Sequence, residues 1–144
     1  MIIQEYEKGR TFVGRLDYRS DILDSINEII NEKGVKLGCV SIIGAVTSTK
    51  TGYFDTAAKK YVYYEKAGKD RPFEIASCSG NVSLKDGKSF AHLHIVFSDK
   101  NGDCHGGHLM SGTTVYACEF VIQEFLGNDL VRTLDSETGL PLWN

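Results

Sequence analysis

Residues 91–108 read AHLHIVFSDKNGDCHGGH, and the predictions of the sheet and of the site both start from this stretch. The segment from Phe90 to Phe97, which overlaps the beginning of this stretch, is predicted to be a β-strand. His92 and His94 are two residues apart on that strand, so both rings point to one face. All four histidines of the chain fall inside this stretch. All imidazole side chains of the chain are therefore expected on one predicted hairpin.

The turn after this strand decides where the last histidine lies. A three-residue loop at 100–102, with its glycine in the left-handed conformation, pairs Asp99 with Asp103. Counting outward from that pair puts His94 opposite His108. Directly opposed residues on one face have Cβ atoms about 4.5–5.5 Å apart. In this register three imidazoles converge, two along one strand and one across.

A two-residue loop at 101–102 is the alternative, and it shifts the register by one residue. His108 then faces away, unless Gly106 and Gly107 form a bulge. The pattern permits convergence of three rings without forcing it. In the regular register His105 has the opposite parity and stays outside the group.

Three neutral imidazoles beside an open position form a common catalytic zinc pattern, and carbonic anhydrase is the well-known case. We therefore predict a metal site on His92, His94 and His108. Iron, manganese, nickel or copper fits the same ligands, and affinity order alone does not choose among them. The alternative to a metal site is a set of surface histidines on a polar sheet face that bind no ion. The two glycines before His108 allow a backbone or a ligand to come close.

Other side chains near this stretch are open candidates. Cys104 is a soft alternative ligand beside His105, although a turn-flanking thiol without a role is the simpler interpretation. Glu74 and Glu119 are candidate acid–base carboxylates or partners of the ligand rings, against the simpler reading of surface glutamates. The sequence assigns no role to any of these four residues.

The helix prediction covers about residues 21–33. Ser20 or Asp21 offers the N-cap, and Gly34 offers the closing left-handed position. One apolar stripe follows helical spacing; its members are Ile22, Leu23, Ile26, Ile29 and Ile30.

Most of the remaining chain predicts strands. The expected strands lie at 11–16, 36–46, 49–54, 60–65, 72–84, 90–97, 115–126 and 130–134. One main helix, about eight strands and short additional helical turns indicate an α+β fold with a mixed, largely antiparallel sheet, in a single domain over residues 1–144. Few helices are left to cover the sheet, so self-association is one way to cover its second face.

The charge balance argues against a nucleic-acid surface. The formal net charge is −3, whereas domains that bind phosphate backbones usually carry a basic excess. One group of basic residues is close in sequence and comprises Lys59, Lys60, Lys66, Lys69 and Arg71. We interpret it as a solvated, lysine-rich hairpin.

Neither a secretion signal nor a membrane span is evident in the sequence. The four cysteines are widely spread without a C-x-x-C pair, which indicates reduced thiols in a cytoplasmic protein. Three of them, Cys39, Cys78 and Cys118, lie in apolar runs and are expected in the core.

The sequence resembles the plants-and-prokaryotes-conserved (PPC) domain family over roughly residues 8 to 127. The most specific part is the pattern H-x-H at 92–94 followed by GGHL at 106–109. Weaker fragments of the same order are Gly14-Arg15-Leu16, Gly44-Ala45-Val46, Gly52-Tyr53-Phe54, Phe73-Glu74-Ile75, Gly80-Asn81 and Glu119.

The resemblance implies a fold similar to that of acetolactate decarboxylase and a homotrimer. It also implies a metal, usually zinc, on the residues that match His92, His94 and His108. In land plants this domain follows an AT-hook that enters the DNA minor groove. The nearest matches to an AT-hook are Gly9-Arg10 and Gly14-Arg15, and neither continues to Arg-Pro. The sequence therefore contains no AT-hook to bind the minor groove.

The expected function is therefore a homotrimeric metal-binding module, possessing a zinc site open to metal-assisted chemistry on a small molecule. The alternative is a DNA-associated or protein-interaction scaffold whose metal is structural. The charge balance and the missing AT-hook oppose DNA binding through this domain alone.

Overall fold

The computed structural model describes residues 1–68 and 71–143, and these residues form one helix and nine strands. The elements in chain order are β1 (Glu7–Leu16), α1 (Ile22–Glu32), β2 (Gly38–Asp55), β3 (Lys60–Ala67), β4 (Phe73–Lys85), β5 (Lys88–Ser98), β6 (Cys104–Leu109), β7 (Thr114–Leu126), β8 (Val131–Leu134) and β9 (Pro141–Trp143). The architecture is α+β, as predicted. Within the described ranges, the expected short helical turns are reverse turns instead.

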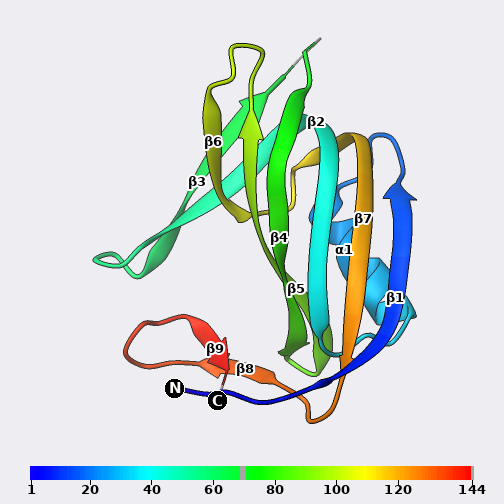
Figure 1. Cartoon of the computed structure of the whole chain (residues 1–144). Coiled ribbons are helices and arrows are strands. Elements are labelled where there is room, and N and C mark those ends of the chain that lie inside the picture. Colours follow the sequence, from blue (N-terminus) through cyan, green and yellow to red (C-terminus); the bar gives the residue numbers. More distant parts are fainter. Residues whose placement is uncertain (69–70, 144) are drawn as a thin grey trace.

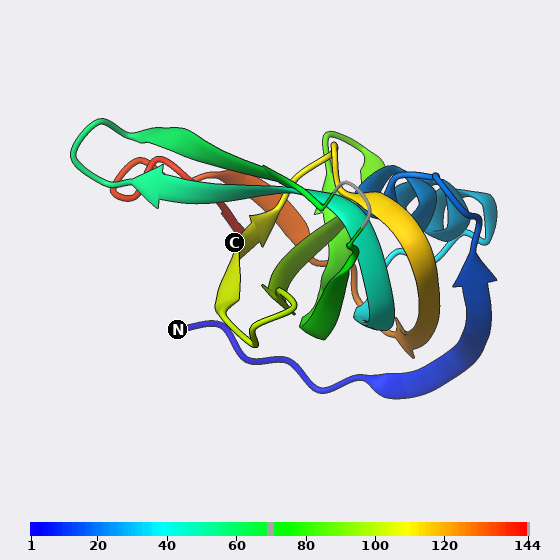
Figure 2. The same ribbon diagram turned by 90° about the horizontal axis from the view of Figure 1, so that it is seen from above.

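Strand β2 organises the sheet. Its first half pairs with β4 and β7, and its second half pairs with β3 and β6. Because β4 also pairs with β5, and β5 with β6, the strands β2, β4, β5 and β6 close a circuit. The β2–β3 hairpin projects away from this circuit (Figures 1 and 2). Every pairing among the named strands is antiparallel except that of β4 with β8, which confirms a mixed, largely antiparallel sheet.

The helix α1 covers the inner face of this sheet, behind β2 and β7 in Figure 1. The Asp21 side chain caps it by accepting a hydrogen bond from the Asp24 backbone N–H at 2.9 Å. Its buried residues are Ile22, Ile26 and Ile30, all from the predicted stripe. Gly34 follows the helix with a φ of 65°, as expected for the closing position. No described residue belongs to a helix with the length and hydropathy needed to cross a bilayer.

The outer face of β1, β7 and β2 is not covered by α1. Val13, Val121 and Ile43 lie on this face, and all three are exposed. The opposite parity of the same strands supplies core residues such as Val40, Ile42 and Ile122. This outer face is therefore mixed in the single chain, with the three exposed apolar residues beside exposed Arg15 and Glu119.

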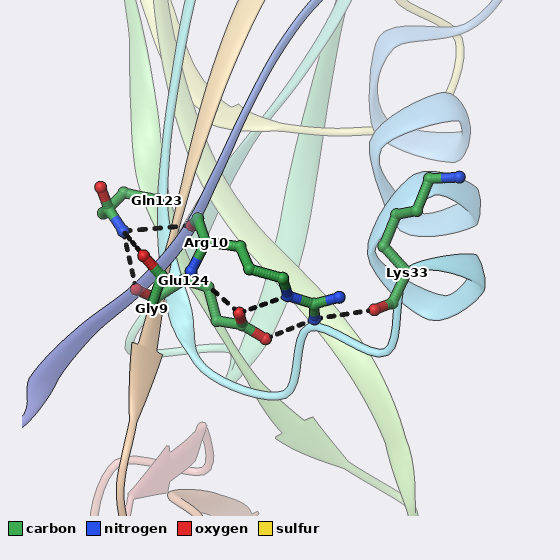
Figure 3. Close-up of polar contacts among 5 residues, drawn as sticks. All are labelled: Gly9, Arg10, Lys33, Gln123 and Glu124. Carbon is green, nitrogen blue, oxygen red and sulfur yellow. Dashed lines mark hydrogen bonds and ion pairs between the residues drawn. The ribbon is translucent and has the colours of Figure 1, made fainter.

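An arginine–glutamate pair ties the N-terminal strand to the sheet and to the end of α1 (Figure 3). Arg10 Nε and Nη2 donate to the two carboxylate oxygens of Glu124, each at 2.6 Å. Arg10 Nη2 also donates to the Lys33 backbone carbonyl at 2.9 Å. The pair lowers the pKa of Glu124 and raises that of Arg10. It thus joins β1, β7 and the C-terminus of α1.

Three local expectations need correction. The strands expected at 36–46 and 49–54 are one continuous strand, β2, because a register shift near Gly44 and Val46 absorbs the irregularity without ending the strand. The strand β9 was not predicted, because its three residues are too few to show an alternating pattern of apolar and polar residues. Cys39 is exposed on the outer face of β2, whereas Cys78 and Cys118 are buried as expected, and all four cysteines are free. Lys69 of the basic group lies outside the described residues.

Candidate metal centre

The β5–β6 hairpin has the register that the three-residue loop predicts. The ladder runs from the pair Ser98–Cys104 to the pair His94–His108. The loop closes through the Asp99 N–H, which donates to the Asp103 carbonyl at 3.1 Å. Gly102 lies at a φ of 85°, the left-handed conformation that this loop requires.

The three predicted histidines form a cluster on the outer face of this hairpin. Ring centroids are 5.2 Å apart between His92 and His94, 4.8 Å between His92 and His108, and 5.4 Å between His94 and His108. One ring nitrogen from each residue lies within 4.8 Å of the other two. His92 and His108 are half-buried, and His94 is exposed. The cluster therefore opens toward solvent on one side.

Glycines allow the strands to approach closely behind the cluster. A Cβ atom on Gly106 would lie 2.4 Å from the Ile95 carbonyl oxygen, and one on Gly107 would lie 2.9 Å from that of Gly52. Gly52 of β2 pairs with His108, so these contacts hold β6 between β5 and β2. The expectation that the glycine pair admits a close backbone is confirmed.

Burial keeps two of the rings neutral. It lowers the pKa of His92 to about 4, with smaller contributions from the charges of His108, Arg132 and His94. Burial likewise lowers the pKa of His108 to about 4, helped by His94, Arg132 and Lys85. Neutral imidazole is the form that binds a metal ion. Both rings are thus in their ligating form at neutral pH.

The donor set fits a transition-metal ion. Within the described residues, none of the three rings makes a hydrogen bond to another protein group, so their nitrogens are available as ligands. Zinc binds imidazole nitrogen at about 2.0–2.1 Å, so two nitrogens on one ion can be at most about 4 Å apart. Rotation of the rings by a small angle closes the difference from 4.8 Å.

A pocket of about 560 Å³ lies directly over the cluster. The histidines form one wall, and the β2–β3 hairpin and the β8–β9 segment form the others. Its lining includes Tyr61, Phe54, Phe90, Lys85, Arg132 and Leu142. No aspartate or glutamate of the described chain lines it. The pocket is apolar, with two cations and three histidines at its base.

Arg132 belongs to this site although sequence reasoning missed it. It lies on β8 and pairs with Lys85 in the parallel β4–β8 ladder. Nε donates to Ser83 Oγ at 2.9 Å, Nη2 to Asn81 Oδ1 at 2.8 Å and Nη1 to the Pro141 carbonyl at 3.0 Å. Its guanidinium stacks 5.1 Å from the ring centroid of Trp143. Only a non-local, parallel pairing brings it there, and no sequence motif marks such a pairing.

The other candidate residues lie elsewhere. His105 faces away from the cluster, with its ring 6.0 Å from that of Phe97, and it lines a separate pocket of about 260 Å³. Cys104 is exposed, and its thiol points to the Gly102 carbonyl at 3.7 Å. Glu74 and Glu119 are exposed, and neither lines the pocket over the histidines. The structure thus brings none of these four residues to the cluster.

Comparisons with known proteins agree with this geometry. The chain is 43% identical to a metal-containing protein from Archaeoglobus fulgidus, with a TM-score of 0.93 over 100% of this chain and 99% of that one. It is 31% identical to a plant- and prokaryote-conserved (PPC) protein from Pyrococcus horikoshii, with a TM-score of 0.92 over 100% and 97% of the two chains. A provisionally assigned DNA-binding protein from Bacteroides thetaiotaomicron is 25% identical, with a TM-score of 0.85 over 96% of each chain.

Acetolactate decarboxylase from Bacillus subtilis shares the fold alone, as the resemblance implied. It is 17% identical with a TM-score of 0.56, and the match covers 88% of this chain and 56% of the enzyme. No match was found among curated proteins.

A family sequence model also matches most of the chain. The sequence model of the Plants and Prokaryotes Conserved (PCC) domain, the family abbreviated PPC above, matches residues 3–126, which include all three clustered histidines. The chain therefore belongs to the Plants and Prokaryotes Conserved domain family.

Proposed function

We propose that this protein binds one divalent transition-metal ion, zinc in the simplest case, on His92, His94 and His108. The observation that carries the proposal is the convergence of three ring nitrogens within 4.8 Å at the base of a pocket. The relative from Archaeoglobus fulgidus is itself described as metal-containing. Three protein ligands leave a coordination position open, which is typical of catalytic and not of structural zinc sites.

The proposed activity is metal-assisted chemistry on a small molecule bound in this pocket. A bound metal ion would supply Lewis acidity, polarising a carbonyl oxygen or lowering the pKa of a water molecule to about 7. Burial raises the pKa of Tyr61, so its phenol stays protonated and can donate a hydrogen bond to the bound molecule. No carboxylate of the described residues lines the pocket, so proton transfer would rest on solvent or on Tyr61.

We further propose that the protein is a cytoplasmic homotrimer. The exposed apolar residues Val13, Ile43 and Val121 on one outer sheet face support self-association, since exposed apolar side chains grouped on one face often mark a protein interface. Four free cysteines support a reducing compartment. Sedimentation equilibrium of the wild type and of Val121→Lys tests the trimer. We expect three times the chain mass for the wild type and a smaller mass for the variant.

Elemental analysis of purified protein tests the metal site. We expect about one metal ion per chain in the wild type. His92→Ala and His108→Ala should each lose most of it, because two imidazoles hold an ion poorly. His105→Ala is the matched control: it removes a nearby ring that faces away and should retain the metal. Circular dichroism of each variant separates loss of metal from loss of fold. Metal retention by folded His92→Ala and His108→Ala would overturn the proposal.

A DNA-associated scaffold is the second candidate, because the relative from Bacteroides thetaiotaomicron is provisionally assigned as a DNA-binding protein. The formal net charge of −3 opposes it. Retention of duplex DNA at low salt, declining steeply as salt rises, would support this candidate. Absence of retention at 50 mM salt, roughly the low end of the range where such contacts are strong, would remove it.

A further inference from the structure

Arg132 is a buried residue, only 8% exposed, yet all of its hydrogen-bond acceptors are neutral. These acceptors are the Ser83 hydroxyl, the Asn81 amide oxygen and the Pro141 carbonyl. Among residues 1–68 and 71–143, no aspartate or glutamate forms an ion pair with it. A guanidinium stays charged in proteins, so a buried positive charge is left without a negative partner.

The hydrogen-bonding capacity of this corner is also incompletely used. A guanidinium carries five N–H groups, and three of those on Arg132 have partners. The indole Nε1 of Trp143, which stacks on the same guanidinium, is buried without an acceptor in the described structure. Buried donors normally have partners, so the corner lacks a group that accepts hydrogen bonds.

An acceptor for the free N–H groups of Arg132 would lie in the pocket, because Arg132 is one of its lining residues. Asn81, which holds Nη2, pairs directly with His92 across the β4–β5 ladder, so the guanidinium and the histidine cluster share one sheet face. Arg132 and Lys85 both line the pocket, and no carboxylate of the described chain does. Residues 1–68 and 71–143 therefore supply no counter-charge in this pocket, which favours a bound anion adjacent to the proposed metal.

We propose that Arg132 binds the carboxylate of a small organic acid whose remaining atoms fill the pocket over the histidines. Two N–H groups of Arg132 remain for a ligand, and a guanidinium commonly binds a carboxylate through paired N–H···O bonds. The apolar lining by Phe54, Phe90 and Leu142 suits a short carbon chain. This inference names the substrate class for the proposed function. That the bound acid is a substrate rests on the proposed function, whereas the binding of the acid does not.

Titration of the metal-free, full-length protein with butyrate tests the inference. Trp143 is the only tryptophan of the chain and stacks on Arg132, so its fluorescence reports occupation of this corner. We expect saturable binding of butyrate and none of butyramide, which has the same shape without the charge. This comparison needs no variant. Equal responses to butyrate and butyramide would overturn the inference, and so would tighter binding of inorganic phosphate than of butyrate.

Variants then locate the carboxylate. Arg132→Gln should weaken butyrate binding by about 30-fold or more, as expected when a buried charge pair loses one partner. Arg10→Gln is the matched control, because it removes a guanidinium remote from the pocket and should leave butyrate binding unchanged. Unchanged binding by a folded Arg132→Gln variant would sink the proposal.

Metal content is measured on the same samples, so the two proposals can fail separately. Zinc binding without any butyrate response would keep the metal site and reject the carboxylate site. A butyrate response in a protein that never takes up metal would do the reverse.

Discussion

Arg10 and Arg132 present the same side chain in opposite surroundings. Arg10, with a side chain 54% exposed, has a carboxylate partner in Glu124 and a backbone carbonyl in Lys33 (Figure 3). Arg132, at 8% exposed, has three neutral acceptors and an aromatic ring. The arginine that water could solvate has an internal counter-charge, whereas the buried one has none among residues 1–68 and 71–143. We conclude that Arg10 is neutralised for structure, whereas the charge of Arg132 is kept available for a ligand.

Supplying Arg132 with an internal carboxylate should have the largest effect, because it removes this difference. Asn81→Asp is nearly isosteric, and Asn81 Oδ1 already accepts from Nη2 at 2.8 Å. We expect butyrate affinity to fall by about 30-fold or more, since the ligand would then compete with a fixed anion. The Trp143 fluorescence titration measures it. Unaltered butyrate affinity in Asn81→Asp would place the ligand elsewhere.

Replacing each arginine in turn should show which of the two contributes more to the free energy of unfolding. Arg132→Ala leaves the buried Ser83 hydroxyl and the Asn81 amide oxygen without their donor and removes packing on Trp143. We expect the free energy of unfolding to fall by about 2 kcal/mol, as for loss of buried hydrogen-bond partners. Urea unfolding at pH 7 measures it. A larger loss for Arg10→Ala than for Arg132→Ala would contradict this ranking.

Acid should affect the surroundings of Arg132 before those of Arg10. The pKa of His92 and that of His108 are about 4 in the folded chain, below the value of about 6.5 for an unfolded histidine. A lowered folded pKa means that the unfolded chain binds protons first, so stability is full above pH 6.5 and is lost as pH falls toward 4. Urea unfolding of metal-free protein across this range measures the loss. The double variant His92→Gln, His108→Gln should show a flatter curve, and an identical curve would contradict the assignment.

The Arg10–Glu124 pair should give the smallest effect, at a lower pH. Arg10 lowers the pKa of Glu124, so the stability due to the pair is present above the unfolded glutamate pKa of about 4.3 and is lost as pH falls through the lower folded value. Arg10→Gln should therefore be less stable than the wild type at pH 7, with the difference vanishing in acid. The loss stays small because the Arg10 backbone N–H still donates to Glu124 at 3.1 Å. A difference that persists at pH 2, as measured by urea unfolding, would argue against an ionic origin.

The local parts of this structure could be predicted, and the non-local parts could not. The cap at Asp21, the end of α1 at Gly34 and the register of the β5–β6 hairpin all depend on neighbouring residues, so the sequence reveals them. The histidine cluster follows from that register. Arg132 reaches the same face only through the parallel pairing of β8 with β4, which joins residues far apart in the chain. Glu74 and Glu119 were candidates by residue type alone. The register pairs Glu74 with Ser98 and Glu119 with Ile43, on the histidine-bearing face but away from the histidines, and neither residue lines the pocket.

The left-handed turn at Gly102 has a consequence for how this hairpin can vary in length. Side chains on a strand alternate between faces, so the connection between Ser98 and Cys104 sets the phase of everything after it. Inserting or deleting one residue there would carry His108 to the core side; an insertion would put Gly107 opposite His94, and a deletion would put Leu109 there. Changes by two residues would restore the phase. Homologous hairpins that keep the third histidine should therefore differ in loop length by even numbers, unless a bulge compensates.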